Sequence, residues 1–153
     1  MILKIELNNN KYKLIRLRLN MIKIMKKAKR ILLIDDEDVI LFGFTKVLQE
    51  PGVELDCAQT LEEVRNCIAI HKYEAAIVDL RLSNSTEMEG LDCVRLLRSS
   101  QAECRIFVLT AYGDNAVKDR AEALGVDMFL EKPIEPSIIR KTLKTFGVYD
   151  NIV

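Results

Sequence analysis

The chain has 153 residues, 49% apolar and 30% charged, and its Lys/Arg and Asp/Glu counts are equal at 23 each. This length and balance indicate one water-soluble domain with a sizeable core, which excludes the disordered and membrane-spanning classes. No apolar run approaches the ~20 residues that span a bilayer, and no signal-peptide core is present, so we expect a cytoplasmic protein. The four cysteines lack C-x-x-C spacing and only one His is present, so we expect reduced cysteines and no zinc site.

Charge is unevenly distributed along the chain. Residues 1–30 hold ten Lys/Arg and one Glu (+9), whereas residues 31–153 hold thirteen Lys/Arg and 22 Asp/Glu (−9). We interpret residues 1–27 as a basic extension, either disordered or a marginal hairpin that turns at residues 8–10, with no part in the chemistry. Such segments can touch nucleic acid or anionic lipid, but they are more often merely solvated. We therefore expect no nucleic-acid partner and no membrane partner.

From residue 28 onward, short apolar strands alternate with stretches of helical spacing. The expected strands are 30–34, 53–58, 75–80, 104–110 and 126–130. The helix after the first strand stops at Pro51-Gly52, and Thr60 and Glu63 have capping-box spacing at the start of the next one. Pro136 opens the last helix, in which Ile138, Ile139 and Leu143 are expected to face inward. Five β/α units predict an α/β fold with a doubly wound, five-stranded parallel sheet in a domain over residues 28–148, followed by a tail at 149–153.

Four of the five strands end in a polar group that could carry chemistry. These groups are Asp35-Asp36, Asp79, Thr110 and Lys132. Because the carboxyl ends of parallel strands share one edge of the sheet, we expect these side chains to converge. Clustered carboxylates repel one another unless a cation intervenes, and hard oxygen ligands suit Mg²⁺. A Lys and a Thr can bind phosphoryl oxygens, and a carboxylate attacking phosphorus gives an aspartyl phosphate. Each of these groups taken alone is more simply explained by a structural role. A structural role does not explain why all four occur together at the strand ends.

The residues around these positions resemble the receiver domain of two-component response regulators. The motifs that carry the resemblance are Ile31-Leu32-Leu33-Ile34-Asp35-Asp36-Glu37, Ile77-Val78-Asp79-Leu80, Val108-Leu109-Thr110-Ala111 and Lys132-Pro133. The resemblance covers roughly residues 29–147, and the joint pattern is highly specific. It implies a flavodoxin-like fold with strand order 2-1-3-4-5. It further implies a phospho-accepting signalling protein rather than a turnover enzyme.

The resemblance assigns roles to individual residues. Asp79 would accept the phosphoryl group from the phosphohistidine of a histidine kinase or phosphotransfer protein. The groups expected to hold Mg²⁺ are Asp35, Asp36, Asp79 and the backbone carbonyl of Arg81. Lys132 would pair with the phosphoryl oxygens, and its bond to Pro133 would be cis. Thr110 and Phe129 would form the switch that responds to the phosphate, although an aromatic residue on a strand often only packs.

Two departures from the family pattern bear on the acceptor. Ser83 stands where the family commonly has a Pro, and Gly90 lies eleven residues after Asp79 instead of about eight, so the loop between them is about three residues longer. Arg81 and Tyr112 occupy positions that tune water access in the family. Both are large, and we expect them to shield an acyl phosphate and slow self-dephosphorylation.

Competing functions fit the motifs less well. Haloacid-dehalogenase-type phosphatases place Asp-x-Asp after the first strand, and a flavin site would not tolerate the acidic residues 35–37 near its phosphate. A phosphorylation-independent docking module usually lacks one or more of the acceptor, acid pair, Thr and Lys. Only seven residues follow Phe146, so we expect no output domain. Output would pass to a downstream protein or a homodimer through the fourth helix, fifth strand and fifth helix of the receiver unit.

Overall fold

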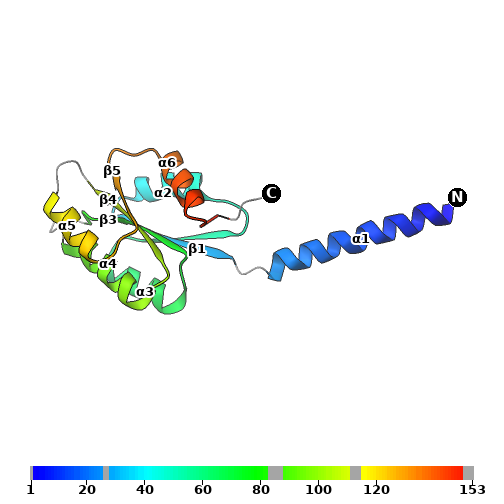
Figure 1. The fold of residues 1–153 in the computed structure, drawn as a ribbon, viewed down its shortest axis with the longest axis horizontal. Coiled ribbons are helices and arrows are strands. Elements are labelled where there is room, and N and C mark those ends of the chain that lie inside the picture. The colour runs from blue at the N-terminus through cyan, green and yellow to red at the C-terminus, as the bar shows by residue number, and fades with distance from the viewer. Residues whose placement is uncertain (1, 26–27, 83–87, 111–114, 150–153) are drawn as a thin grey trace.

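Five parallel strands form one sheet in the order β2-β1-β3-β4-β5 (Figure 1). The computed structural model describes residues 2–25, 28–82, 88–110 and 115–149. Its strands are β1 (Lys29–Ile34), β2 (Val53–Ala58), β3 (Ala75–Asp79), β4 (Arg105–Thr110) and β5 (Met128–Glu131). Its helices are α1 (Ile2–Met25), α2 (Asp38–Leu48), α3 (Leu61–Ile70), α4 (Met88–Ser100), α5 (Asn115–Ala123) and α6 (Pro136–Thr145). The predicted α/β class and strand order are confirmed.

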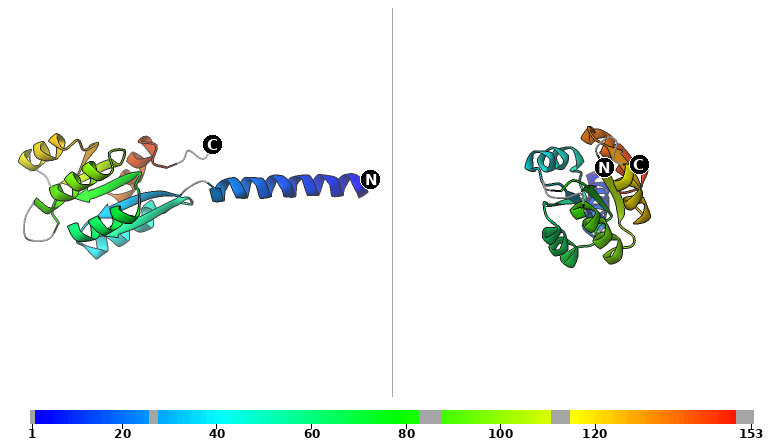
Figure 2. Two further views of the ribbon diagram at one scale, coloured as in Figure 1. Left: turned by 90° about the horizontal axis from the view of Figure 1, so that it is seen from below. Right: turned by 90° about the vertical axis from the view of Figure 1, so that its left-hand side faces the viewer.

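Helices cover both faces of the sheet (Figures 1 and 2). Side chains of a strand alternate between faces, so Ile31 and Leu33 pack in one buried cluster with α2 and α6. Leu32 and Ile34 pack in a second cluster with α3, α4 and α5 on the other face. Burial on both sides explains why the central strands are continuous apolar runs.

Local sequence signals set the helix boundaries. The Thr60 hydroxyl accepts a hydrogen bond from the Glu63 amide at 3.2 Å, as expected at the start of α3. Pro136 opens α6, again as predicted. The inward orientation predicted for Ile138 is wrong: it is 50% exposed, whereas Ile139 and Leu143 are fully buried. Residues four apart share one face of a helix, and Ile138 is turned about 100° from that face.

The predicted tail begins one residue too early. Tyr149 is 3% exposed and packs in the cluster beneath α2 and α6. Its hydroxyl donates a 2.9 Å hydrogen bond to the backbone carbonyl of Leu48. An aromatic side chain with a satisfied hydroxyl belongs to the folded domain.

The hairpin considered for the amino-terminal segment is wrong, because residues 2–25 form the single helix α1 (Figure 1). The alternation of apolar and polar residues there is short and irregular, and residues 8–10 lack the glycine that favours a tight turn. Leu, Lys and Arg, which make up 11 of the 24 residues of α1, are good helix formers. Among the described residues, no helix is long and apolar enough to cross a membrane.

Candidate functional site

The sheet register brings the polar strand ends to one edge. Asp79 ends β3 opposite Leu109 of β4, and Thr110 ends β4 opposite Glu131 of β5. Asp35 directly follows β1, which pairs with β3. Residues almost a hundred positions apart in the chain therefore meet at the carboxyl edge, where open α/β sheets bind ligands.

Asp79 is held in place by two donors. Its carboxylate is buried, with the residue 5% exposed. The Arg81 amide donates to Oδ1 at 3.0 Å, and the Lys132 ammonium donates to Oδ2 at 2.7 Å. A charge-assisted bond of this length offsets part of the cost of burying the carboxylate. The arrangement fixes the carboxylate at the edge of the sheet, where its oxygens can meet a reacting group.

Asp35 lies next to Asp79 and is equally buried. The Glu37 amide donates to Asp35 Oδ1 at 2.9 Å, and Lys132 Nζ lies 3.5 Å from Oδ2. Burial raises the pKa of the Asp35 carboxyl above its ordinary value, and the neighbouring Asp79 carboxylate adds to the rise. The Glu37 amide and the Lys132 charge oppose this rise only in part. Two carboxylates thus share one ammonium, which leaves the pair with a net negative charge.

Lys132 connects the two buried carboxylates. Burial alone would lower the pKa of its ammonium, but the hydrogen bond and charge of Asp79, with a further contribution from Asp35, leave the pKa raised. The Lys132 amide donates to the Thr110 carbonyl at 2.8 Å, and the Lys132–Pro133 peptide bond is cis. The ammonium is thus a charged donor aimed at Asp79.

Three carboxylates in this cluster could hold a cation. Oxygens of Asp35, Asp36 and Asp79 all lie within 4.8 Å of one another, with Asp36 exposed and the other two buried. An all-oxygen set with one solvent-facing member suits Mg²⁺, which binds one or two carboxylates and keeps several waters. The net negative charge around Asp35 points the same way. The residues present therefore fit the metal that the sequence predicts.

Thr110 and Phe129 lie on the adjacent strands β4 and β5. Thr110 is 3% exposed at the end of β4. Phe129 is half-buried on β5 and packs against the cluster formed with α3, α4 and α5. Thr110 and Phe129 are not directly opposite each other in the sheet, because Thr110 pairs with Glu131, two residues further along β5.

The loops above the site are described only in part. Tyr112, Ser83 and most of the lengthened segment after Asp79 lie outside the described residues, so the shielding prediction stays a prediction. Gly90 is described, and it has a clear packing role. A Cβ placed on Gly90 would lie 2.4 Å from the Leu80 carbonyl oxygen, closer than any real contact. Only glycine allows α4 to approach the backbone directly after Asp79.

The sequence reading missed one residue that supports the acidic loop. The Gln59 side-chain amide donates to the Asp36 carbonyl at 3.3 Å and to Asp38 Oδ1 at 2.8 Å. It thereby braces the backbone of the exposed acid in the cluster. The available signal was position: Gln59 follows the end of β2, just as the other site residues follow or end their strands.

Comparisons with known proteins agree with this geometry. Residues 31–144 match the family described as response regulator receiver domain. The chain is 33% identical over 119 residues to the photosynthetic apparatus regulatory protein RegA of Cereibacter sphaeroides, covering 78% of this chain and 63% of RegA. It is 29% identical over 115 residues to the acid tolerance regulatory protein ActR of Rhizobium meliloti, covering 75% of this chain and 58% of ActR. The chain therefore spans less than two thirds of these relatives.

Solved structures show the same architecture. A CheY-like receiver domain protein from Methanospirillum hungatei aligns with a TM-score of 0.70 at 24% identity, covering 77% of this chain and 92% of that one, a likeness of fold. A response regulator from Burkholderia pseudomallei aligns with a TM-score of 0.65 at 28% identity, covering 82% of this chain and 76% of that one. Its crystal structure contains a phosphorylated aspartic acid, a calcium ion and citrate.

Proposed function

Because this chain belongs to the response regulator receiver domain family, we propose that it accepts a phosphoryl group on Asp79 and signals by a conformational switch. The contact that supports this most directly is the 2.7 Å bond from Lys132 Nζ to Asp79 Oδ2. It lies beside two further carboxylates, one of them exposed. A buried carboxylate serving only structure would not need a cation site next to it. The donor would be the phosphohistidine of a histidine kinase or phosphotransfer protein.

Transfer would proceed by attack of an Asp79 oxygen on the phosphorus atom. The P–N bond of the donor breaks, its electrons remain on the imidazole, which takes up a proton, and a P–O bond forms on Asp79. Mg²⁺ held by Asp35, Asp36, Asp79 and the Arg81 carbonyl would neutralise charge on the phosphoryl oxygens. Lys132 would move from the carboxylate to a phosphoryl oxygen, and the Arg81 amide fixes the orientation of Asp79.

Intact mass measurement tests the acceptor. The full chain is incubated with Mg²⁺ and acetyl phosphate, alongside Asp79→Asn and the matched exposed-acid control Asp119→Asn. We expect a gain of about 80 Da on the wild type and on Asp119→Asn, and none on Asp79→Asn. A gain that persisted in Asp79→Asn would move the acceptor elsewhere, and no gain on the wild type would overturn the proposal.

The cation site can be tested without phosphorylation. Mg²⁺ that binds only the folded state raises the melting temperature with concentration. We expect this rise in the wild type and a much smaller one in Asp36→Asn, whose side chain is exposed. An equal rise in both proteins would place the ion elsewhere.

The switch would use Thr110 and Phe129. Phosphate at Asp79 offers new acceptors to the Thr110 hydroxyl, and movement of that residue changes the space beside Phe129. The chain contains no tryptophan, so Phe129→Trp supplies a single reporter. We expect its emission to change with acetyl phosphate and Mg²⁺ and to stay constant when Thr110→Val is added. A change that survives Thr110→Val would remove Thr110 from the switch.

We further propose that α5, β5 and α6 form the surface that a downstream protein or a second receiver reads, because Phe129 lies on β5 within it. We also propose that Arg81 and Tyr112 slow hydrolysis of the acyl phosphate. A phosphate half-life unchanged in the double variant Arg81→Ala, Tyr112→Ala would refute the shielding idea.

A further inference from the structure

Helix α1 carries apolar side chains that nothing in the structure covers. Every described side chain from residue 9 to 22 is exposed, and the large apolar ones are 45–66% exposed. Large apolar side chains left exposed together along one helix indicate an interaction site. Helices in proteins draw most of their stability from packing of an apolar face rather than from intrinsic propensity. Both observations call for a partner surface.

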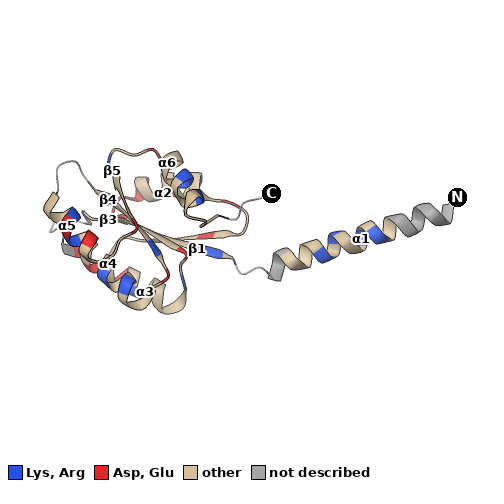
Figure 3. Cartoon of the chain, viewed as in Figure 1, with Lys and Arg blue, Asp and Glu red and all other residues tan. Residues whose placement is uncertain are grey.

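The apolar residues of α1 form two rows with basic residues between them. At 100° per residue, Leu14, Leu17 and Met21 lie on one side of the helix. The other row lies on the opposite side and consists of Tyr12, Ile15, Leu19 and Ile22. By the same angle, the basic residues Lys11, Lys13, Arg16 and Arg18 lie between the rows. Figure 3 shows Lys and Arg, and no Asp or Glu, on the coloured part of α1. The partner surface must therefore be apolar with an acidic border.

This layout argues against two simple partners. A helix lying on a membrane surface has one apolar face and one polar face, whereas α1 has apolar rows on opposite sides. A second copy of α1 packed along the Leu14, Leu17 and Met21 row would bring the flanking basic columns of the two helices together. Like charges at those flanking positions oppose pairing.

The receiver body offers a groove of the complementary kind. A cavity of about 510 Å³ lies between α2 and the segment that follows β5. Its apolar lining includes Val39, Ile40, Gly43, Phe44, Pro133 and Ile134. Glu37 also lines it, and the exposed Glu135 stands between two lining residues. Lys132 lines it as well, but its charge is committed to Asp79 and Asp35.

We propose that α1 of one copy binds in this groove of a second copy. Its row of Leu14, Leu17 and Met21 would lie on the groove floor, and its basic residues would lie beside Glu37 and Glu135. The sequence charges are complementary, +9 over residues 1–30 and −9 over residues 31–153. α1 projects away from its own receiver body in Figure 1 and in the left-hand view of Figure 2, which favours a contact between copies. A reciprocal exchange of helices would close a two-fold dimer.

The groove also borders the proposed phosphorylation site. Lys132 lines the groove and contacts Asp79, so a docked helix would lie beside the acceptor. Self-association and access to Asp79 would then share one surface.

Sedimentation velocity on the full chain, with charge reversal on either side of the contact, tests the proposal. We expect a dimer for the wild type. The helix variant Lys11→Glu, Lys13→Glu, Arg18→Glu and the groove variant Glu37→Lys, Glu135→Lys should each weaken association about tenfold or more, because each places like charges across the contact. The chain that carries both sets should recover to within about threefold of the wild type, because the charge pairs are restored with inverted sign.

Matched controls separate this contact from other effects. Arg65→Glu, Lys72→Glu, Arg95→Glu makes the same charge change on exposed cations of the body, away from the groove and from α5, β5 and α6, and should leave the dimer intact. Circular dichroism and melting of each variant verify folding. Leu14→Asp, Leu17→Asp, which removes an exposed apolar row without touching the core, should also give monomers.

Three outcomes would overturn the proposal. The first is a wild-type chain that stays monomeric at its highest attainable concentration, as it would if α1 folded onto its own body. The second is a dimer that the groove variant leaves unchanged, which would place the contact elsewhere, between two α1 helices or on the α5, β5 and α6 surface. The third is a double set that fails to recover although both parents are folded.

Discussion

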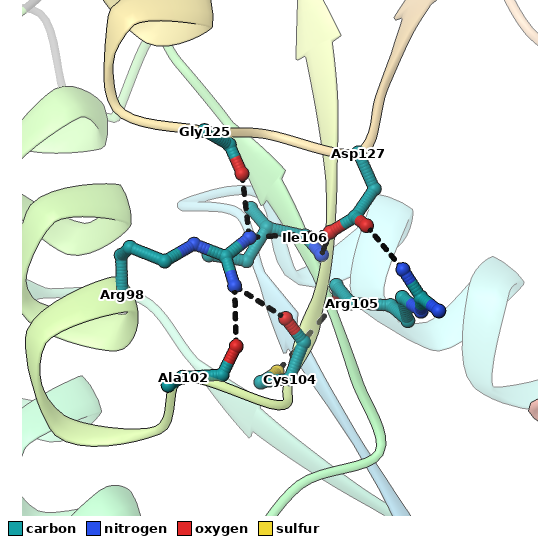
Figure 4. Close-up of polar contacts among 7 residues, drawn as sticks. All are labelled: Arg98, Ala102, Cys104, Arg105, Ile106, Gly125 and Asp127. Carbon is teal, nitrogen blue, oxygen red and sulfur yellow. Dashed lines mark hydrogen bonds and ion pairs between the residues drawn. The ribbon is translucent and has the colours of Figure 1, made fainter.

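Asp127 is expected to anchor the edge of the sheet opposite the acceptor, and its removal gives a sharp test of the packing described above. The carboxylate accepts hydrogen bonds from the Ile106 amide at 2.8 Å, Arg105 at 2.8 Å and Arg98 at 3.2 Å (Figure 4). Arg98 also donates to the carbonyls of Ala102, Cys104 and Gly125. The cluster thus joins the end of α4, the start of β4 and the segment before β5.

The magnitude follows from what each replacement leaves behind. A hydrogen bond to a charged group contributes roughly 1.5–3 kcal/mol. Asp127→Ala leaves the Ile106 amide and Arg98 without this acceptor, so we expect a loss of about 2–3 kcal/mol in the free energy of unfolding. Asp127→Asn keeps an oxygen for the Ile106 amide, and a loss of about 1–2 kcal/mol is expected. Arg105→Ala should cost less than either, because its side chain is 53% exposed and screened by water.

The effect should depend on pH in one direction. Burial tends to raise the pKa of Asp127, but the Ile106 amide and the two arginines outweigh it and leave the pKa below its ordinary value. A carboxyl whose pKa is lower in the folded state contributes stability above its unfolded pKa of about 3.9. That contribution is lost as pH falls through the lower, folded-state value.

Urea unfolding of the wild type, Asp127→Asn, Asp127→Ala and Arg105→Ala at several pH values measures these differences. The gap between the wild type and Asp127→Asn should be constant from about pH 7 to pH 5 and should shrink below about pH 4. A gap that is the same at pH 3 as at pH 7 would refute the electrostatic reasoning. A loss below about 0.5 kcal/mol for Asp127→Ala would refute the packing role.

Further predictions concern single groups elsewhere in the domain. Gly90→Ala should destabilise by roughly 1–3 kcal/mol in thermal or urea unfolding, because its Cβ would collide with the Leu80 backbone; Gly43→Ala, with nothing within 4 Å of the added carbon, is the control and should be neutral or stabilising. Tyr149→Phe should cost about 1–2 kcal/mol through the unpaired Leu48 carbonyl, and no change in urea midpoint would contradict that role. Asp35→Asn should raise the metal-free melting temperature at pH 7, because the pKa of this carboxyl is raised in the folded state and its ionisation therefore opposes folding above about pH 4. The same variant should lose most of the Mg²⁺-dependent rise in melting temperature. A lowered metal-free melting temperature would contradict the expected direction of the stability change.

Sequence reasoning reached the site because its residues mark the ends of apolar strands. The parallel alternation of strands and helices predicts that the carboxyl ends of the strands share one edge, so Asp79 and Lys132 were expected to lie close together before any geometry was known. The resemblance to receiver domains supplied their chemical roles. Gln59 escaped because its only signal is position after β2, and its bonds to the Asp36 loop depend on a side-chain rotamer.

Other features depended on burial and distance, which a one-dimensional pattern does not carry. Ile138 and Ile139 are the same residue type and adjacent, and only the rotation of α6 against the sheet decides which one is buried. Gly90 looked like a displaced family glycine until its contact with Leu80 gave it a packing reason.

The amino-terminal segment shows most clearly which features the sequence predicts and which only the tertiary structure decides. Its charge and composition identified a basic extension, but its alternation was too weak to choose between strand and helix, and the structure settles on α1. The sequence by itself determined the alternation of strands and helices, the apolar layers and the acids, hydroxyl and lysine at the carboxyl edge, because periodicity and connection rules are local properties of the chain. The strand order was implied by the resemblance to receiver domains. Only the tertiary structure decided the 2.7 Å contact between Lys132 and Asp79 and the acid-bordered groove beside it, because both arise where segments distant in sequence come together.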